Sequence, residues 1–169
     1  NPIKWLDAKN IILDSFSSFH PESSNLAELF FKNNWIDASL RKGKASGAFA
    51  HPSVPSLHPY ILVNYQGKIR DVMTLAHELG HGVHQILAGK NGLLMAETPL
   101  TLAETASVFG EMLVFRKLLD ESSIAQKKQL LSGKIEDMLN TVARQIGFHQ
   151  FEVKFHEARI KSELTPDEI

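Results

Sequence analysis

Apolar residues recur at helical spacing in five stretches of the chain, and polar residues occupy the opposite faces. Proline punctuates the pattern, because Pro21 stops the first stretch and Pro99 suits the first turn of the fourth. The last stretch is the longest, with an interruption expected near Ser132 and Gly133. The spacing therefore predicts helices over residues 6–19, 22–35, 71–88, 99–119 and 124–163.

Between the second and third helices the pattern changes to small, aromatic and branched residues. Residues 60–65, Tyr-Ile-Leu-Val-Asn-Tyr, lie between Pro59 and Gly67 and predict a strand. Residues 46–50 are the expected partner strand. These patterns predict a mainly α (α+β) fold with a small antiparallel β-hairpin or sheet, in one unit that spans residues 1–169.

The amino-acid composition indicates which kinds of binding partner are not expected. Lys and Arg number 18 and Asp and Glu 19, so the net charge is -1, and we expect neither a nucleic-acid groove nor a basic membrane patch. No apolar run approaches the roughly 18 residues of a membrane span. The chain has no Cys, which excludes a thiolate zinc site and is compatible with the cytoplasm, the location we expect.

The candidate chemistry lies in the third predicted helix. His77 and His81 are four residues apart in an H-E-x-x-H pattern, so both imidazoles share one helix face and can converge on a metal ion. Glu78 lies about 100° round the helix, where it flanks the ion without competing for it. The pattern predicts two metal ligands and a carboxylate that can act as general base on a water molecule.

A catalytic zinc usually takes a third protein ligand and leaves one position open. A third His six residues after the second is excluded, because that position is Leu87, and His84 lies too far along the same helix. Glu97 and Glu104 remain. We favour Glu104, since it lies one turn into a helix that can return past the first after a loop of about ten residues.

Several other residues are candidates for supporting roles. Glu111 lies two turns after Glu104 on the same face, where it can accept a hydrogen bond from a ligand imidazole. His84 can line the pocket. Gly47 and Ala48 precede a strand edge that can pair with an extended peptide, although a hairpin that only supports the metal helix is an equal alternative.

Several separated motifs follow one another along nearly the whole chain. They are residues 35–37 (WID), 43–49 (GKASGAF), 58–65 (HPYILVNY), 76–84 (AHELGHGVH) and 103–107 (AETAS), with Arg144-Gln145 and Phe151-Glu152. In this order they resemble the oligoendopeptidase F branch of the thimet oligopeptidase family of zinc peptidases. The resemblance implies a zincin-like helical core with one zinc ion held by His77, His81 and Glu104, and Glu78 as catalytic base.

The resemblance also implies a truncated catalytic core. The family has a large helical part before this region and a Tyr- and His-bearing segment after it. We therefore expect a zinc metalloendopeptidase acting on oligopeptides that lacks N- and C-terminal parts of its parent chain and turns over slowly. The alternative is a non-catalytic, zinc-binding helical scaffold or partner-binding domain.

Overall fold

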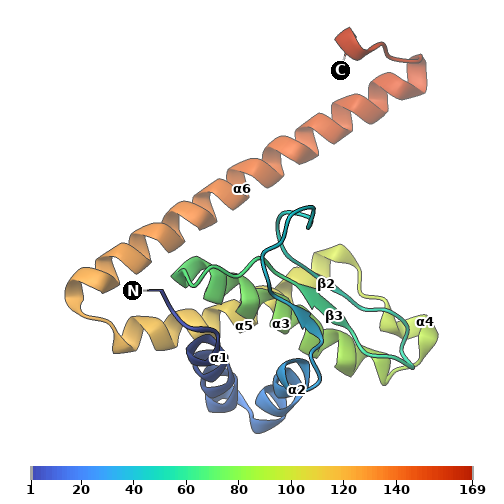
Figure 1. Cartoon of the computed structure of the whole chain (residues 1–169). Helices are drawn as coiled ribbons and strands as arrows, with labels where there is room; N and C mark the ends of the chain where they lie inside the picture. Colours follow the sequence, from blue (N-terminus) through green and yellow to red (C-terminus); the bar gives the residue numbers. More distant parts are fainter. Residues whose placement is uncertain (1, 169) are drawn as a thin grey trace. The chain divides into compact units, whose positions relative to one another are not determined.

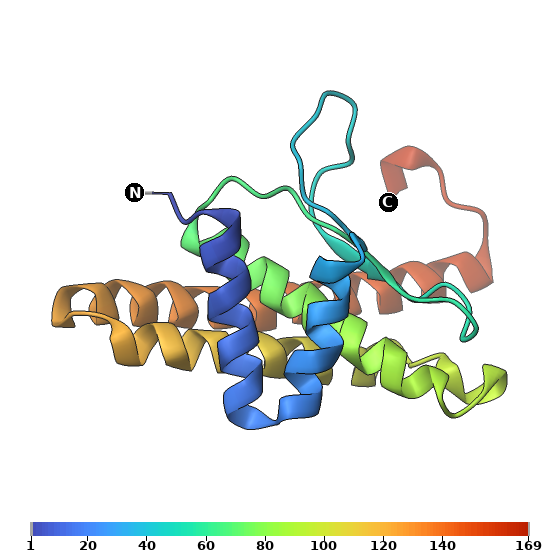
Figure 2. The same cartoon turned by 60° about the horizontal axis from the view of Figure 1, so that its bottom comes forward.

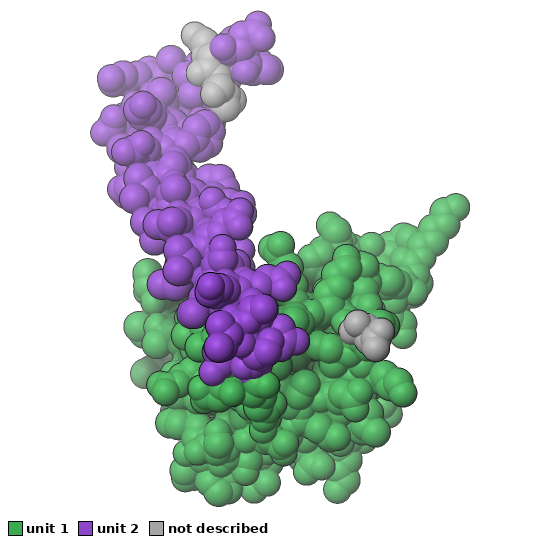
Figure 3. Space-filling view, turned by 90° about the vertical axis from the view of Figure 1, so that its left-hand side faces the viewer, with its two compact units in different colours: residues 1–121 green, residues 122–169 purple. Residues whose placement is uncertain are grey.

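The computed structural model describes residues 2–168, which form two compact units that meet between residues 121 and 122 of the chain (Figure 3). The first unit contains five helices and three short strands among its described residues. They are α1 (Trp5–Phe19), α2 (Pro21–Lys32), β1 (Ile36–Asp37), β2 (Phe49–His51), β3 (Tyr60–Leu62), α3 (Ile69–Gly89), α4 (Leu93–Ala96) and α5 (Leu100–Glu121). The predicted mainly helical fold with a small sheet is confirmed.

The second unit consists of the long helix α6 (Ile124–Lys161) and the 3-10 turn η1 (Pro166–Glu168). Ser123 begins α6 because its hydroxyl accepts a hydrogen bond from the backbone N–H of Gln126. The helix is continuous, so the interruption expected near Ser132 and Gly133 does not occur. Whether the whole chain works as one catalytic core stays a prediction. Among residues 2–168, no helix has the length and apolar character needed to cross a membrane.

Helices α1 and α2 form an antiparallel pair that packs against α3 and α5 (Figure 1, Figure 2). The core lies between these helices and the sheet, and α3 runs through its middle. The fully buried side chains of this core include Ile12, Phe30, Ile61, Val72, Leu75, Leu79 and Val114. The core therefore holds α3, the helix with the H-E-x-x-H pattern, on several sides.

The sheet is mixed and has the strand order β1-β3-β2. Strands β2 and β3 pair antiparallel, as expected, with Ala50 opposite Ile61. Strand β1 is an addition to the expected hairpin, because it pairs parallel to β3 with Ile36 opposite Ile61. The helix expected to continue to residue 35 ends at Lys32, since Asn34 adopts a positive φ of 58°. The chain turns at Asn34, and the residues that follow it pair with β3 as β1.

A buried lysine holds the loop after β1 against the sheet. The Lys44 side chain is 2% exposed, and its ammonium donates to the backbone carbonyls of Asp37 (2.9 Å), Ser39 (3.0 Å) and Val63 (2.7 Å). Arg41 adds a bidentate contact to the Asp37 carboxylate at 2.7 and 2.6 Å. The hydrogen bond from Arg41, opposed by burial, and then that from Lys44 lower the pKa of Asp37 to about 2.

We expect Lys44→Met to lower the free energy of unfolding by about 2 kcal/mol, because it removes a buried charged donor from three backbone carbonyls, two of them part-buried. Urea unfolding measures the loss. Lys42→Met is the matched control, since Lys42 is an exposed lysine in the same loop and should change the stability little. Equal unfolding midpoints for both variants would contradict this role of Lys44.

Candidate metal centre

The helix α3 positions the two histidines on one face. Asp71 lies in its first turn, where the carboxylate accepts hydrogen bonds from the backbone N–H groups of Gln66 (2.8 Å) and Lys68 (2.9 Å). This is the structural role expected for an acidic residue at a helix start. His77 and His81 follow on consecutive turns, with ring centroids 5.0 Å apart. Both rings are partly exposed, so a dissolved ion can reach them.

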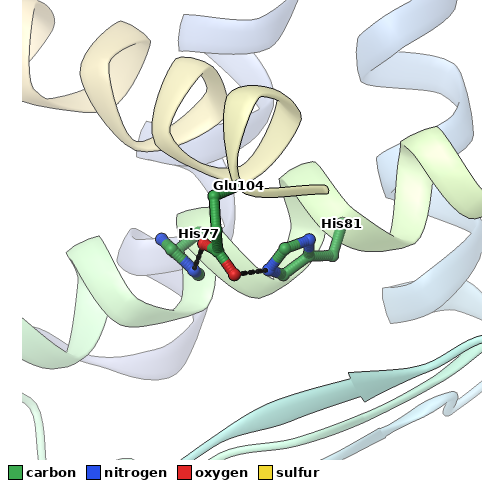
Figure 4. A group of neighbouring side chains, drawn as sticks. All are labelled: His77, His81 and Glu104. Carbon is green, nitrogen blue, oxygen red and sulfur yellow. Dashed lines mark ion pairs between the residues drawn. The ribbon is translucent and has the colours of Figure 1, made fainter. Parts of the chain in front are cut away.

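Glu104 approaches the two histidines from α5 (Figure 4). Its carboxylate lies between the imidazoles, with Oε2 3.2 Å from His77 Nε2 and Oε1 3.5 Å from His81 Nε2. Donor atoms of the three residues all lie within 4.8 Å of one another. Glu97, the alternative considered from the sequence, follows α4 and is outside this group.

The separation of the donor atoms fits a small tetrahedral ion. Bonds of about 2.0–2.2 Å to nitrogen and oxygen place neighbouring ligands of a tetrahedral zinc about 3.4 Å apart. The separations of 3.2 and 3.5 Å, which run from His77 and His81 to different oxygens of Glu104, are each close to that length. Two imidazoles and one carboxylate are also a donor set that catalytic zinc uses, and three ligands leave a fourth position for water or substrate.

Close packing of α3 on α5 brings Glu104 to this position. A Cβ built on Gly80 would lie 2.7 Å from the Ala106 carbonyl oxygen and 2.8 Å from Ser107 Cα. Gly110 continues the contact, because its Cβ would lie 3.2 Å from Gly80 Cα. Small residues therefore let the two backbones touch, which places the start of α5 directly beside the face of α3 that carries both histidines.

Glu111 lies behind His77. Its carboxylate Oε2 is 3.3 Å from His77 Nδ1, on the opposite edge of the ring from Glu104. An imidazole that donates its Nδ1 proton to a carboxylate keeps the Nε2 lone pair for a cation. Burial lowers the pKa of His77, but the hydrogen bond to Glu111 and the charges of Glu78 and Glu104 raise it overall above its ordinary value.

Glu78 is buried, with 6% of its surface exposed. Burial raises its pKa to about 7, the charge of His77 opposes this, and the charge of Glu104 adds to it. The pKa of His81 is lowered by burial, while Glu104 opposes the shift and His77 and His84 add to it. The candidate centre therefore concentrates several ionisable groups in a partly buried space.

The other candidate residues take varied positions. Gly47 is exposed at a φ of 87°, and its carbonyl accepts a hydrogen bond from the Asn64 amide at 3.0 Å. Ala48 packs against the core just before β2. His84 is half-buried on α3, one turn after His81. None of these three residues belongs to the candidate metal-binding group, which among the described residues is His77, His81 and Glu104.

Gln85 is a residue that sequence reasoning missed. It lies four residues after His81, so it continues the face that carries both histidines. Its amide donates to the carbonyl of Ala50 on β2 at 3.4 Å, which connects α3 to the edge strand of the sheet. The repeat of four from His77 through His81, extended by one step, is the signal that could have identified this position.

Fold and site together define a mainly helical core whose central helix carries the H-E-x-x-H pattern of zinc metallopeptidases. The chain belongs to peptidase family M3, because the model of that family matches residues 15–169.

Named relatives agree with this assignment. The chromosomal oligoendopeptidase F of Lactococcus lactis subsp. cremoris is 34% identical over 153 residues, which are 89% of this chain and 25% of the relative. Oligopeptidase PepF of Bacillus subtilis is 29% identical over 168 residues, 98% of this chain and 25% of that protein. The chain thus spans about a quarter of the length of these relatives.

Solved structures show the same fold. A crystal structure from Chlamydophila abortus, provisionally described as a peptidase, superposes with a TM-score of 0.79 at 31% identity. The match covers 94% of this chain and 27% of that one. The structure of PZ peptidase A with an inhibitor superposes with a TM-score of 0.62 at 20% identity, over 70% of this chain and 22% of that one, and supports the fold alone.

Proposed function

We propose that this chain is the zinc-binding part of a metalloendopeptidase that hydrolyses peptide bonds in oligopeptides. His77, His81 and Glu104 hold one zinc ion per chain, and Glu78 is the general base. The observation that carries the proposal is the convergence of three donor groups, whose ligand atoms all lie within 4.8 Å of one another, beside a buried glutamate. Membership of peptidase family M3 supports the same reaction class.

The zinc ion and the side chains have different roles in the proposed reaction. When bound, zinc lowers the pKa of a water molecule and polarises the scissile carbonyl. Glu78 accepts one proton from the attacking water as the oxygen bonds to the carbonyl carbon. It then gives this proton to the nitrogen of the leaving amine as the C–N bond breaks. Its burial keeps competing water away from the carboxylate.

Glu111 orients the first ligand. Its carboxylate accepts a hydrogen bond from the Nδ1–H group of His77 at 3.3 Å, which fixes both the tautomer and the plane of the ring. The Nε2 atom of His77 then points toward the carboxylate of Glu104, on the side where the ion is bound. Glu111 thus acts on the ligand and has no direct part in the proton transfers.

The strand β2 is the proposed site of peptide binding. It lies at the edge of the sheet, contacts α3, and is tied to that helix through Gln85. An extended peptide that pairs with the free edge of β2 gains main-chain hydrogen bonds with little sequence preference. Gly47 and Ala48, which lead into the strand, leave room for a second backbone, and His84 lies one turn beyond the ligands on α3.

A variant of the base tests this function. We expect Glu78→Gln to bind zinc as the wild-type chain does and to hydrolyse a peptide with blocked termini about 10² to 10⁴ times more slowly, because the amide accepts no proton from water. Release of a quenched fluorophore at high protein concentration measures the rate. Glu136→Gln, which removes an exposed carboxylate of α6, is the control.

Two results would contradict the proposal. The first is hydrolysis that survives both a zinc chelator and Glu78→Gln. The second is a purified wild-type chain that binds no zinc after incubation with the ion. If zinc binds but neither variant nor wild type hydrolyses any peptide, the scaffold alternative is favoured.

A further inference from the structure

Ser107 makes a contact to Glu104 that the proposed ligand set does not explain. It lies three residues after Glu104 on α5, and its side chain is fully buried. The hydroxyl oxygen is 2.9 Å from Glu104 Oε2 and 3.1 Å from the Glu104 backbone carbonyl. Since a hydroxyl carries a single proton, the carboxylate and the carbonyl compete for it or share it.

The charged acceptor is favoured in this competition. Hydrogen bonds to an ionised carboxylate are stronger than those to a neutral carbonyl, and more so where water is excluded. The close contact of Gly80 with Ser107 Cα excludes water from this side of α5.

Glu104 depends on such a partner more than the histidines do. Its side chain is 51% exposed, against 25% for His77 and 15% for His81, so packing against neighbouring side chains restrains it less. The oxygen that Ser107 contacts, Oε2, is also the one 3.2 Å from His77 Nε2. With Oε2 held there, Oε1 is directed to His81, at 3.5 Å.

We propose that Ser107 is a positioning residue for the metal centre. Its hydroxyl fixes the carboxylate of Glu104 between the two imidazoles and so raises the affinity of the site for a divalent cation. This inference rests on the ligand set of the proposed function. A purely structural role would instead resemble that of Ser15, a buried serine of α1 whose hydroxyl donates to the Ile11 carbonyl at 2.6 Å.

The test compares zinc affinities of the whole chain, measured by competition with a coloured chelator. We expect Ser107→Ala to weaken zinc binding about 10- to 100-fold, the usual effect of losing a partner of a metal ligand. Ser15→Ala removes the same group from the same core but should leave the zinc affinity unchanged. Its unfolding temperature also shows how much a lost buried hydroxyl costs in stability alone.

A double-mutant cycle separates the positioning of Glu104 from a general loss of stability in Ser107→Ala. In the background of Glu104→Ala, whose weaker binding is measured by direct titration with excess zinc, the serine has no carboxylate to hold, so adding Ser107→Ala should change the zinc affinity less than twofold. An equal loss of affinity in both backgrounds would overturn the proposal, as would Ser107→Ala binding zinc within twofold of wild type. In either case, tight binding by the wild-type chain that His77→Ala removes would leave the ligand set intact.

Discussion

Replacing His77 with alanine is expected to abolish stoichiometric zinc binding while the fold persists. The wild-type chain should retain one zinc ion after gel filtration, and the variant should retain none. Two ligands bind zinc more weakly than three. The loss of zinc affinity should therefore exceed the roughly 10- to 100-fold effect of removing a residue that only hydrogen-bonds to a ligand. Because the His77 side chain is 25% exposed and lies outside the apolar core, its loss should leave the packing of α3 intact.

Thermal unfolding gives an independent measure of the same prediction. A ligand that binds only the folded state at about 100 times its Kd adds about 2.7 kcal/mol of stability. Zinc should therefore raise the Tm of the wild-type chain and leave that of His77→Ala unchanged. His149→Ala, which removes an exposed imidazole from α6, is the control and should behave as wild type. Retention of zinc by His77→Ala would refute the proposed ligand set.

The helices could be predicted from the sequence because their apolar faces are long and regular. The third predicted helix, residues 71–88, differs by two residues at its start from α3, which begins at Ile69. The predicted and observed helix ends differ more where the backbone conformation of a single residue ends the helix. The positive φ of Asn34 ends α2 early, and nothing in the apolar spacing of residues 26–31 indicates this.

The sheet was harder to predict because its first strand is short. Two residues are too few to show alternation, and β1 depends on contacts distant in sequence. The backbone N–H of Ile61 donates to the Trp35 carbonyl at 2.9 Å, and that of Val63 to the Asp37 carbonyl at 3.0 Å. The buried ammonium of Lys44 adds to these contacts, although lysine is typical of exposed loops.

The candidate centre could be located from local spacing alone. The four-residue repeat places His77 and His81 together, and the length of the following loop favours Glu104 over Glu97. Distances across helices could not be derived in this way. That Ser107 contacts the Glu104 carboxylate depends on how closely α3 and α5 approach, and Gly80 governs this approach through the absence of a side chain.

The contact between α3 and α5 leads to the second large effect. We expect Gly80→Ala both to destabilise the chain and to weaken zinc binding, although position 80 is a variable position of the H-E-x-x-H pattern. The new Cβ would lie 2.7 Å from the Ala106 carbonyl oxygen and 2.8 Å from Ser107 Cα, both backbone atoms that no rotamer change can move. The helices must separate, at a cost of about 1–3 kcal/mol.

Separation of the helices also moves the third ligand. Glu104 lies one turn before Ser107, so a shift of α5 lengthens the donor separations of 3.2 and 3.5 Å. Urea unfolding and zinc titration should therefore both report a loss for Gly80→Ala. The control is Gly147→Ala in α6, where a Cβ meets nothing within 4 Å and alanine should stabilise the helix by about 0.5–1 kcal/mol. If Gly80→Ala unfolds and binds zinc as wild type does, close packing of α3 on α5 is not what positions Glu104.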